Sequence, residues 1–527
     1  MAHRPTEWPP DHGASGVLQQ WRFSNPHAAM KPAVHFQGQR IDPDTFFARW
    51  QTAALALRAL GVKEGDVIAL MVRNSPLALE LTLAARWIGA YWCPINWHFK
   101  TDEVQHILAD SGARVLIADQ NILAGLEGLN AEGVAVFAAH AGAPGEFPSW
   151  EAVCQGTESA PVPQSPQRGA MFYTSGTTGR PKGIRRAAST PEQVAAGLAV
   201  MRHCMGFEAE KYPQIRALVS APMYHSAPNS YAIGASLENA ELFIETRFDA
   251  EDTLRLIAQH RITHAYLVPT MYVRMLRLPA QVKARYDIRS IQFVGSTGSP
   301  CPPDVKRDMI GWWGPVIHES YGSSELGYMT RLDSPEALLK PGSAGKALPG
   351  VSIAILGDTG QPLLTGQAGL IYAHHNAVAD FTYNGNDAAR RAMEIDGKKT
   401  MGDIGYIDED GFLFIVDRSA DMVISGGVNI YPAEIEAALQ MMPGVADCAV
   451  FGVPDEEFGE ALACAVQAAP GATLDAAAVQ AYLKTRLASY KVPQQVYFHA
   501  ELPREDTGKI FKRKLREPFW VGKSRRI

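Results

Sequence analysis

Between about residues 44 and 320, amphipathic helix-like segments alternate with short apolar runs rich in β-branched residues. The helix-like segments include 46–60, 77–89 and 103–110, and the apolar runs include 67–72, 114–119, 216–221, 264–269 and 291–296. This alternation is typical of βαβ units, in which largely parallel strands are covered by helices. The pattern therefore predicts an α/β fold with parallel-sheet subdomains for the large N-terminal lobe.

The pattern changes after about residue 340, where short strands punctuated by glycine predict a small antiparallel, barrel-like subdomain. From Asp417 onward, a strand, a glycine loop, two helices and two further strands predict a compact α+β domain. The helices are expected over 432–442 and 475–488, and the strands over 447–452 and 461–467. We therefore predict an N-terminal domain over 1–417 and a small, mobile C-terminal domain over 418–527.

Composition narrows the classes of partner. With 46% hydrophobic and 20% charged residues the chain reads as a soluble globular protein, and a formal net charge of −6 gives no general attraction to nucleic acid or anionic membranes. Six cysteines without CxxC spacing suggest neither a disulfide framework nor a zinc site, which fits the cytoplasm. No apolar stretch approaches about 18 residues, so no membrane span is expected. A small-molecule partner is favoured, and a homodimer is the default expectation.

Residues 173–183 read YTSGTTGRPKG and follow an apolar, strand-like run. Consecutive backbone NH groups in a loop without bulky side chains form a concavity that binds anions, and the Ser and Thr hydroxyls add donors. Lys182 supplies a positive charge. The spacing is not that of a Walker A loop, because Pro181 precedes the lysine. The composition favours a phosphate-binding loop over an exposed linker.

TSGTTGRPKG resembles the phosphate-loop signature of the adenylate-forming superfamily, which includes acyl-CoA synthetases, aryl-CoA ligases, luciferases and adenylation domains. Further motifs follow in the family's order, so the resemblance covers about residues 30–517. It implies that ATP phosphates are held by Thr174, Ser175, Gly176, Thr177, Thr178 and Lys182.

ESYGSSELG (319–327) resembles the family's YGxTE element. The resemblance implies that Tyr321 stacks on adenine and that Glu325, with Thr174, holds Mg²⁺, a hard cation that prefers oxygen ligands. Ser324 replaces the usual Thr and keeps the hydroxyl; Gly322 and Ser323 complete the nucleotide-binding stretch. Taken alone, the same letters would describe a turn with capping residues.

GSTGSP (295–300) resembles the adenine-contacting turn of the family and implicates Gly295, Ser296 and Thr297. A plain strand-to-helix turn is nearly as good an interpretation of these six letters.

Two segments, TMGDIGYIDEDGF (400–412) and DRSADMVISGGVNIYPAEIE (417–436), resemble the ribose-binding and hinge elements. They imply that Asp403 accepts from the ribose hydroxyls and that Arg418 donates to ribose or phosphate oxygens. Met401 stands where a Thr usually precedes the Gly-Asp pair, and Ala420 where the hinge usually has Asp or Lys. We expect the hinge to rotate without the usual polar contacts.

LPREDTGKIFKRKLRE (502–517) resembles the family's terminal element, with Lys509 as the catalytic lysine whose ammonium stabilises charge on the reacting phosphate. Without its companion motifs the segment would be read as an exposed basic helix. The glycine loop of the C-terminal domain, Ser425, Gly426 and Gly427, would face the pantetheine channel of CoA.

The acid-binding side is expected in APMYHSAPNSYAIG (221–234), where the resemblance makes His225 a catalytic residue between acyl pocket and nucleotide. A lone histidine is more often structural. Amino-acid-activating relatives place an Asp here, whereas residues 223–226 carry no carboxylate, which predicts an acid without an α-amino group. The expected substrate-binding residues are His225, Asn229, Ser230, Tyr231, Gly295 and Gly327.

Taken together, the motifs predict an ATP-dependent carboxylic acid:CoA ligase that uses ATP, Mg²⁺ and CoA and acts on a medium or long aliphatic acid or an aryl acid. Two alternatives stay open. One is a stand-alone adenylating enzyme that loads a carrier protein. The other is a non-catalytic nucleotide-binding relative, suggested only by Met401 and Ala420.

Overall fold

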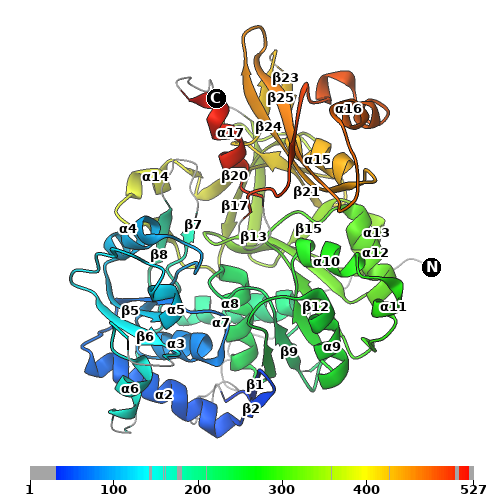
Figure 1. Cartoon of the computed structure of the whole chain (residues 1–527). Helices are drawn as coiled ribbons and strands as arrows, with labels where there is room; N and C mark the ends of the chain where they lie inside the picture. Colours follow the sequence, from blue (N-terminus) through cyan, green and yellow to red (C-terminus); the bar gives the residue numbers. More distant parts are fainter. Residues whose placement is uncertain are drawn as a thin grey trace.

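The structure, a computed structural model, describes residues 31–141, 145–157, 160, 162–174, 181–208, 210–357, 359–426, 428–504 and 510–521. A large N-terminal lobe carries a smaller C-terminal domain, drawn in orange and red at the top of Figure 1. The predicted mixed α/β class with a separate C-terminal domain is confirmed.

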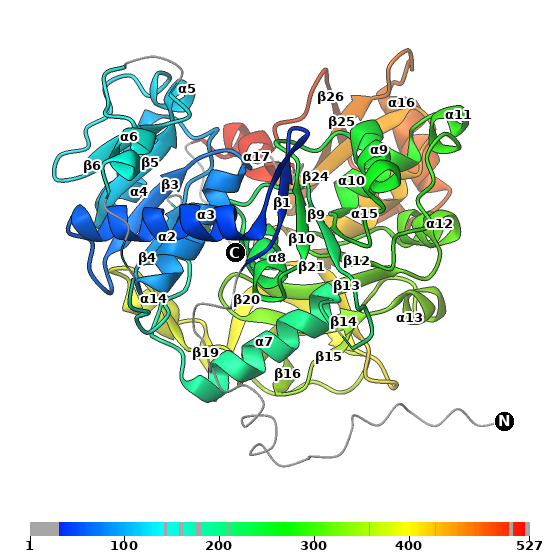
Figure 2. The same cartoon turned by 90° about the horizontal axis from the view of Figure 1, so that it is seen from below.

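A four-stranded parallel sheet forms the first subdomain, in the order β4 (Tyr91–Pro94), β3 (Val67–Met71), β5 (Ala113–Asp119) and β6 (Ala135–Ala139). Helices α2 (Pro43–Ala59), α3 (Pro76–Trp87) and α4 (Thr101–Ser111) accompany it (Figure 2). Asp42 and Ser75 accept hydrogen bonds from the first turns of α2 and α3, which fixes where these helices begin. Every residue of β3 is buried, as expected for a strand between two helical layers.

The second sheet has 14 strands, and one half of it is parallel. This half contains β1 (Val34–Phe36), β10 (Glu241–Ile244), β9 (Arg216–Val219), β11 (His264–Tyr266), β12 (Phe293–Ser296) and β13 (Ile317–Ser323), with β2 (Gln39–Ile41) antiparallel at the edge. The longer helices that connect or flank these strands are α7 (Pro191–Met205), α8 (Ser226–Leu237), α9 (Ala250–His260), α10 (Pro269–Leu276) and α12 (Pro303–Trp313). The carboxyl ends of parallel strands share one edge, which is where α/β sheets bind ligands.

Antiparallel strands make up the other half, and they account for the change of pattern after residue 340. They are β14 (Gly327–Leu332), β15 (Ser343–Ala347), β21 (Leu413–Arg418), β20 (Lys398–Ile407), β17 (Gly369–His375) and β16 (Val351–Leu356), with β19 (Glu394–Ile395) beside β20 and α13 (Ser334–Leu339) after β14. The predicted antiparallel strands are therefore present, but they continue the large sheet through the β13–β14 and β14–β15 pairs.

A small three-stranded antiparallel sheet joins distant segments: β7 (Tyr173–Thr174), β8 (Lys182–Arg186) and β18 (Phe381–Tyr383), followed by α14 (Asp387–Arg391). The segment 145–169, which is rich in Pro, Gly, Ser and Gln, includes the short helix α6 (Trp150–Gln155). Trp150 is 1% exposed and packs edge-on against Phe137, because a side chain of this size gains most from burial.

The C-terminal domain contains β22 (Val423–Ser425), β23 (Val428–Ile430), β24 (Val445–Asp455), β25 (Gly459–Ala468), β26 (Gln495–His499), α15 (Pro432–Gln440), α16 (Ala476–Lys484) and α17 (Lys512–Trp520). Ile435 and Leu483 pack into one buried cluster of this domain, and Leu515 of α17 packs into another with Phe451. The predicted elements are all present, although the second helix ends at Lys484, four residues before its expected end. No helix among the described residues has the length and apolar character needed to cross a membrane.

Candidate active site

A cavity of about 3360 Å³ opens between the N-terminal lobe and the C-terminal domain. Its walls come from the carboxyl edge of the large sheet, the start of α8, strands β20 and β21, and α17. Residues from motifs far apart in the sequence meet there: Thr174, Lys182, His225, Thr297, Tyr321, Glu325, Asp403 and Arg418.

The two ends of the predicted phosphate loop lie side by side in this wall. Thr174 of β7 pairs in register with Lys182 of β8, and both line the cavity. The Lys182 ammonium lies 5.3 Å from the centre of the Tyr383 ring. The predicted ligands between them, Ser175, Gly176, Thr177 and Thr178, lie outside the described residues.

Glu325 is 7% exposed and is held from two sides. Its Oε1 accepts from Thr174 Oγ1 at 3.3 Å and from Tyr383 Oη at 3.2 Å. Its backbone is fixed by the Arg186 guanidinium, which donates to the carbonyls of Ser324 and Glu325. Burial lowers the pKa of Arg186 to about 10, so the group stays charged at neutral pH.

Arg186 and Tyr383 were missed by the sequence reasoning. Neither belongs to a motif, and Arg186 stands 139 residues from Glu325. The pairing of β8 with β18 brings Tyr383 to the Glu325 carboxylate and Arg186 to the backbone carbonyls of Ser324 and Glu325.

The residues around Glu325 fit a magnesium ion held together with nucleotide phosphates. Among the described residues no donor contacts Glu325 Oε2, and no group of three or more His, Cys, Asp or Glu could form a metal cage. Mg²⁺ commonly takes one or two carboxylates, keeps several waters and is completed by substrate phosphates. Glu325 and the Thr174 hydroxyl are the residues that would hold it.

Tyr321, Asp403 and Arg418 form a hydrogen-bonded group on neighbouring strands. Tyr321 Oη donates to Asp403 Oδ2 at 2.6 Å, and Arg418 Nε donates to Oδ1 at 3.2 Å. Asp403 and Arg418 face each other in the β20–β21 register. Burial, followed by the Asp403 charge, raises the pKa of Tyr321 well above its ordinary value, so the phenol is a neutral donor. The Asp403 carboxylate, which is predicted to bind ribose, is therefore held in place on both oxygens, by Tyr321 and by Arg418.

The substitution at Met401 has a local explanation. Thr400 Oγ1 accepts from the backbone NH of Gly402 at 3.0 Å, so the displaced hydroxyl supports the turn before Asp403. Met401 itself packs, as Tyr321 does, against the small buried cluster of Leu326, Met329 and Ala373.

The turn after β12 only partly matches its prediction. Thr297, Gly298 and Ser299 line the cavity, whereas Gly295 and Ser296 belong to β12 and are buried away from it. A Cβ on Gly295 would meet Met205 Sδ of α7 at 3.3 Å, so this glycine serves helix packing rather than ligand approach. The prediction that Gly295 contacts adenine and the acyl group is therefore corrected, and so is the prediction that Ser296 contacts adenine.

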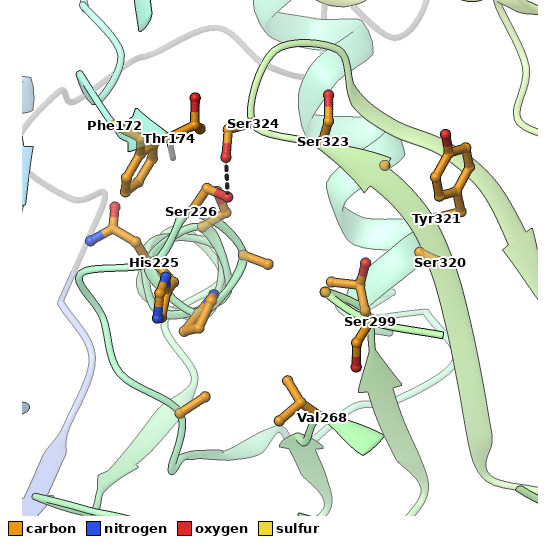
Figure 3. Close-up of a pocket in the computed structure, with 18 of the residues that line it drawn as sticks. Phe172, Thr174, His225, Ser226, Val268, Ser299, Ser320, Tyr321, Ser323 and Ser324 are labelled. Carbon is orange, nitrogen blue, oxygen red and sulfur yellow. Dashed lines mark hydrogen bonds between the residues drawn. The ribbon is translucent and has the colours of Figure 1, made fainter. Parts of the chain in front are cut away.

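The YGSSE stretch forms the opposite wall, and Gly322, Ser323 and Ser324 all line the cavity. A Cβ on Gly322 would lie 2.2 Å from the Gly327 carbonyl oxygen, so only glycine permits the approach of β13 to β14. Ser323 Oγ accepts from the Leu326 amide, as in the turn interpretation. Ser324 and Ser226 hydroxyls share a hydrogen bond of 2.9 Å, the dashed line in Figure 3.

His225 is the residue from which α8 starts, and Figure 3 shows it with Ser226 across the pocket from Ser299 and Tyr321. Its Nε2 is buried and has no hydrogen-bond partner among the described residues. Burial lowers the pKa of His225 to about 4, so the imidazole is neutral at physiological pH. The first turn of α8 also presents backbone NH groups, which favour a carboxylate nearby.

Three of the remaining acyl-binding candidates line the cavity: Asn229, Ser230 and Gly327. Asn229 Oδ1 accepts from Trp92 Nε1 at 3.1 Å, which fixes this side chain. Tyr231 does not line the cavity: it is fully buried and packs against Phe207 and Tyr266. Positions 229 and 231 are about 200° apart around a helix, so α8 directs them to opposite sides.

From the C-terminal domain, Arg504 and Ile510 line the cavity on either side of the segment with Lys509, which itself lies outside the described residues. Ser425 and Gly426 do not line the cavity in this arrangement, and Gly427 is not described. At the expected hinge, the Ala420 carbonyl accepts from Arg516 of α17 at 3.0 Å.

This two-part α/β architecture, with a large cavity between its parts that gathers the predicted nucleotide-binding residues, is that of an adenylate-forming type of protein, and comparisons with known proteins agree. Residues 22–381 match the family described as "AMP-binding enzyme", and residues 434–509 match "AMP-binding enzyme C-terminal domain". The chain therefore belongs to the AMP-binding enzyme family, in the acyl-CoA synthetase branch of the adenylate-forming superfamily.

Similar curated proteins include a feruloyl-CoA synthase from Amycolatopsis sp, 34% identical over 94% of this chain and 96% of that protein. An indoleacetate–CoA ligase from Aromatoleum aromaticum is 32% identical over 95% of this chain and 98% of that protein. Among solved structures, ATP-bound MatB from Rhodopseudomonas palustris aligns with a TM-score of 0.81 and 28% identity, covering 94% of this chain and 97% of that one.

Proposed function

We propose that this enzyme is an ATP-dependent carboxylic acid:CoA ligase that forms an acyl-adenylate and then an acyl-CoA, releasing pyrophosphate and AMP. One observation carries the proposal: Lys182, Glu325, Tyr321, Asp403 and Arg418 all line the cavity into which the start of α8 also opens. These residues supply in one place the contacts for phosphates, metal and nucleoside, next to a neutral imidazole and a helix start suited to a carboxylate.

In the first half-reaction, a carboxylate oxygen of the acid attacks the α-phosphorus, and the bond to the oxygen bridging to the β-phosphorus breaks, so that pyrophosphate leaves. Lys182 and the Thr174 hydroxyl bind phosphate oxygens, and Glu325 holds the metal, which supplies positive charge along the phosphates when bound. Asp403 and Arg418 orient the nucleoside. Lys509 stabilises the negative charge that spreads over the α-phosphate.

In the second half-reaction, the CoA sulfur attacks the acyl carbon, the bond to the AMP phosphate oxygen breaks, and the thiol proton is lost to solvent. We propose that the C-terminal domain, taken from residue 418, turns about residues 418–421 between the two steps. The turn withdraws Lys509 and brings the loop of Ser425, Gly426 and Gly427 to the channel used by the pantetheine arm. That Ser425 and Gly426 stand away from the cavity in the present arrangement supports this alternation.

The acid side of the cavity supports a substrate that is largely apolar and lacks an α-amino group. Residues 223–226 and helix α8 carry no carboxylate to pair with an ammonium. Apolar and aromatic side chains line this part of the cavity, among them Phe172, Ile233, Phe248, Val268 and Met271. The surface suits aryl acids and medium or long aliphatic acids. The two curated relatives described above carry names of aryl acids, which places aryl acids first in a substrate panel.

A panel of aryl, aliphatic and α-amino acids, assayed for acid-dependent exchange of pyrophosphate into ATP, tests the first half-reaction. Measuring AMP and acyl-thioester with free CoA, or with a phosphopantetheine carrier protein in its place, tests the second. We expect exchange with aryl or aliphatic acids and thioester formation with free CoA. Absence of exchange with every acid would overturn the assignment, and transfer to the carrier protein alone would make the protein a carrier-loading enzyme.

A further inference from the structure

We propose that Tyr383 is a positioning residue for the phosphate end of the site: its hydroxyl aims Glu325 at the metal, and its ring holds the ammonium of Lys182. This inference rests on the proposed function for the identity of the ligand, Mg²⁺ with ATP. It assigns a role to a strand that lies outside the sequence motifs described above.

The position of Tyr383 follows from strand pairing. Tyr383 ends β18, whose antiparallel partner β8 begins at Lys182, and Tyr383 stands opposite Ile184 in that register. The Tyr383 side chain is buried at 6% exposure yet lines the cavity. The same three-stranded sheet therefore carries Thr174, Lys182 and Tyr383, the three side chains that contact Glu325 or one another here.

The hydroxyl of Tyr383 decides which oxygen of Glu325 is left for a cation. Both Tyr383 Oη and Thr174 Oγ1 donate to Oε1, at 3.2 and 3.3 Å, whereas no described donor contacts Oε2. Two donors on one oxygen fix the plane of the carboxylate and direct its other oxygen outward. A phenol is protonated at neutral pH, so Tyr383 acts as the donor in this hydrogen bond.

The ring of Tyr383 has a separate task. The Lys182 ammonium lies 5.3 Å from the ring centre, within the range of a cation–π contact. Among the described residues no ion pair joins Lys182 and Glu325: the ammonium lies over the ring, while the carboxylate accepts from Thr174 and Tyr383. A single side chain thus contacts both the cation and the carboxylate.

Two substitutions separate these tasks. Tyr383→Phe removes the hydroxyl and keeps the ring, whereas Tyr383→Leu removes both. The affinity for ATP is measured by titration calorimetry in excess Mg²⁺ and again in EDTA. Thr382→Val is the matched control, because Thr382 lies on the same strand and does not line the cavity, and its hydroxyl donates to Asp387 and to the Tyr383 backbone carbonyl without touching the Tyr383 side chain.

For Tyr383→Phe we expect the gain in ATP affinity on adding Mg²⁺ to fall about tenfold, with the affinity in EDTA unchanged, because a bond to a charged group is lost. For Tyr383→Leu we expect the same loss and, in addition, an affinity in EDTA weaker by about threefold, because Lys182 loses its ring contact. An unchanged Mg²⁺ gain in Tyr383→Phe would overturn the hydroxyl role. An EDTA affinity in Tyr383→Leu equal to that of the unsubstituted enzyme would overturn the ring role.

Melting temperatures show whether the variants are folded, and Tyr383→Met, closer in volume, replaces Tyr383→Leu if the latter does not fold. The outcomes also separate this inference from the proposed ligase reaction. An enzyme that binds Mg·ATP as described but shows no acid-dependent exchange would refute the reaction and leave the role of Tyr383 standing. If the enzyme shows acid-dependent exchange but Tyr383→Phe keeps the full gain in ATP affinity on adding Mg²⁺, the ligase reaction stands and the role of Tyr383 is refuted.

Discussion

Tyr321 donates a hydrogen bond of 2.6 Å to Asp403, joining two motifs that stand 82 residues apart in the chain. Arg418 holds the other carboxylate oxygen, so both oxygens of Asp403 are oriented by neutral or cationic donors. For the ribose contact that we propose, Asp403 is an acceptor that is already fixed, which would lower the entropy lost on binding.

Removal of the Asp403 carboxylate should raise the KM for ATP strongly, by about 10- to 100-fold, because two hydroxyl–carboxylate bonds are lost. Steady-state kinetics of Asp403→Ala check this. Tyr321→Phe serves as the comparison, since it keeps the ring and the carboxylate and should change the KM by less than about threefold. An Asp403→Ala enzyme with an unaltered KM would move the ribose site elsewhere.

Substitution of Lys509 should separate the two half-reactions. Lys509→Ala is expected to reduce acid-dependent release of pyrophosphate by about 100-fold or more, because charge on the α-phosphate loses its counter-ion. Thioester formation from supplied acyl-adenylate should be nearly unchanged. Lys514→Ala, an exposed position on α17 that does not line the cavity, is the matched control. Equal losses in both half-reactions would contradict the assigned role.

Local sequence was sufficient where function depends on contiguous residues. The strand before the phosphate loop and the fold class were predicted because glycine-rich turns and alternating apolar runs are local signals. Asp403 and Arg418 were each identified from a motif, but their contact with each other was not predicted. The placement of Tyr231 was not, because a continuous stretch of letters does not show which face of α8 meets the cavity.

Arg186 and Tyr383 could not be found from sequence for a different reason. Their contacts with Glu325 depend on strand pairing between residues nearly 200 positions apart, as in the Phe381–Arg186 register pair. No periodicity or motif in the sequence predicts such a pairing. Gly295 shows the opposite case. Its motif was recognised, but the glycine is needed there because a Cβ would crowd the sulfur of Met205.

Acid should destabilise the fold through buried neutral histidines. Burial lowers the pKa of His264 to about 4 from an ordinary 6.5, against a smaller opposing effect of its hydrogen bond to Gly206. The unfolded chain therefore binds a proton below about pH 6.5 that the folded protein accepts only near pH 4. Stability falls across that window, by about 3 kcal/mol for this residue.

Urea unfolding at pH 7 and pH 4.5 measures the effect. His264→Gln should lose less stability over this interval than the unsubstituted protein, whereas His374→Gln, at an exposed site, should follow it. Identical pH dependence in all three proteins would show that His264 does not contribute.

Arg516 should hold the hinge where Ala420 offers no polar side chain. Its guanidinium donates to the Ala420 carbonyl at 3.0 Å and lies 3.5 Å from Asp421, while the Arg418 carbonyl accepts from the amides of Asp421 and Met422. Arg516→Gln weakens this support, so we expect the amides of Asp421 and Met422 to exchange with deuterium about tenfold faster. Lys514→Gln, which removes the same charge from the same helix without touching the hinge, should leave their exchange unchanged. Equal exchange rates in both variants would mean that the Arg418–Met422 turn is held by its own backbone bonds, and that the contact of α17 with the hinge does not restrain domain rotation.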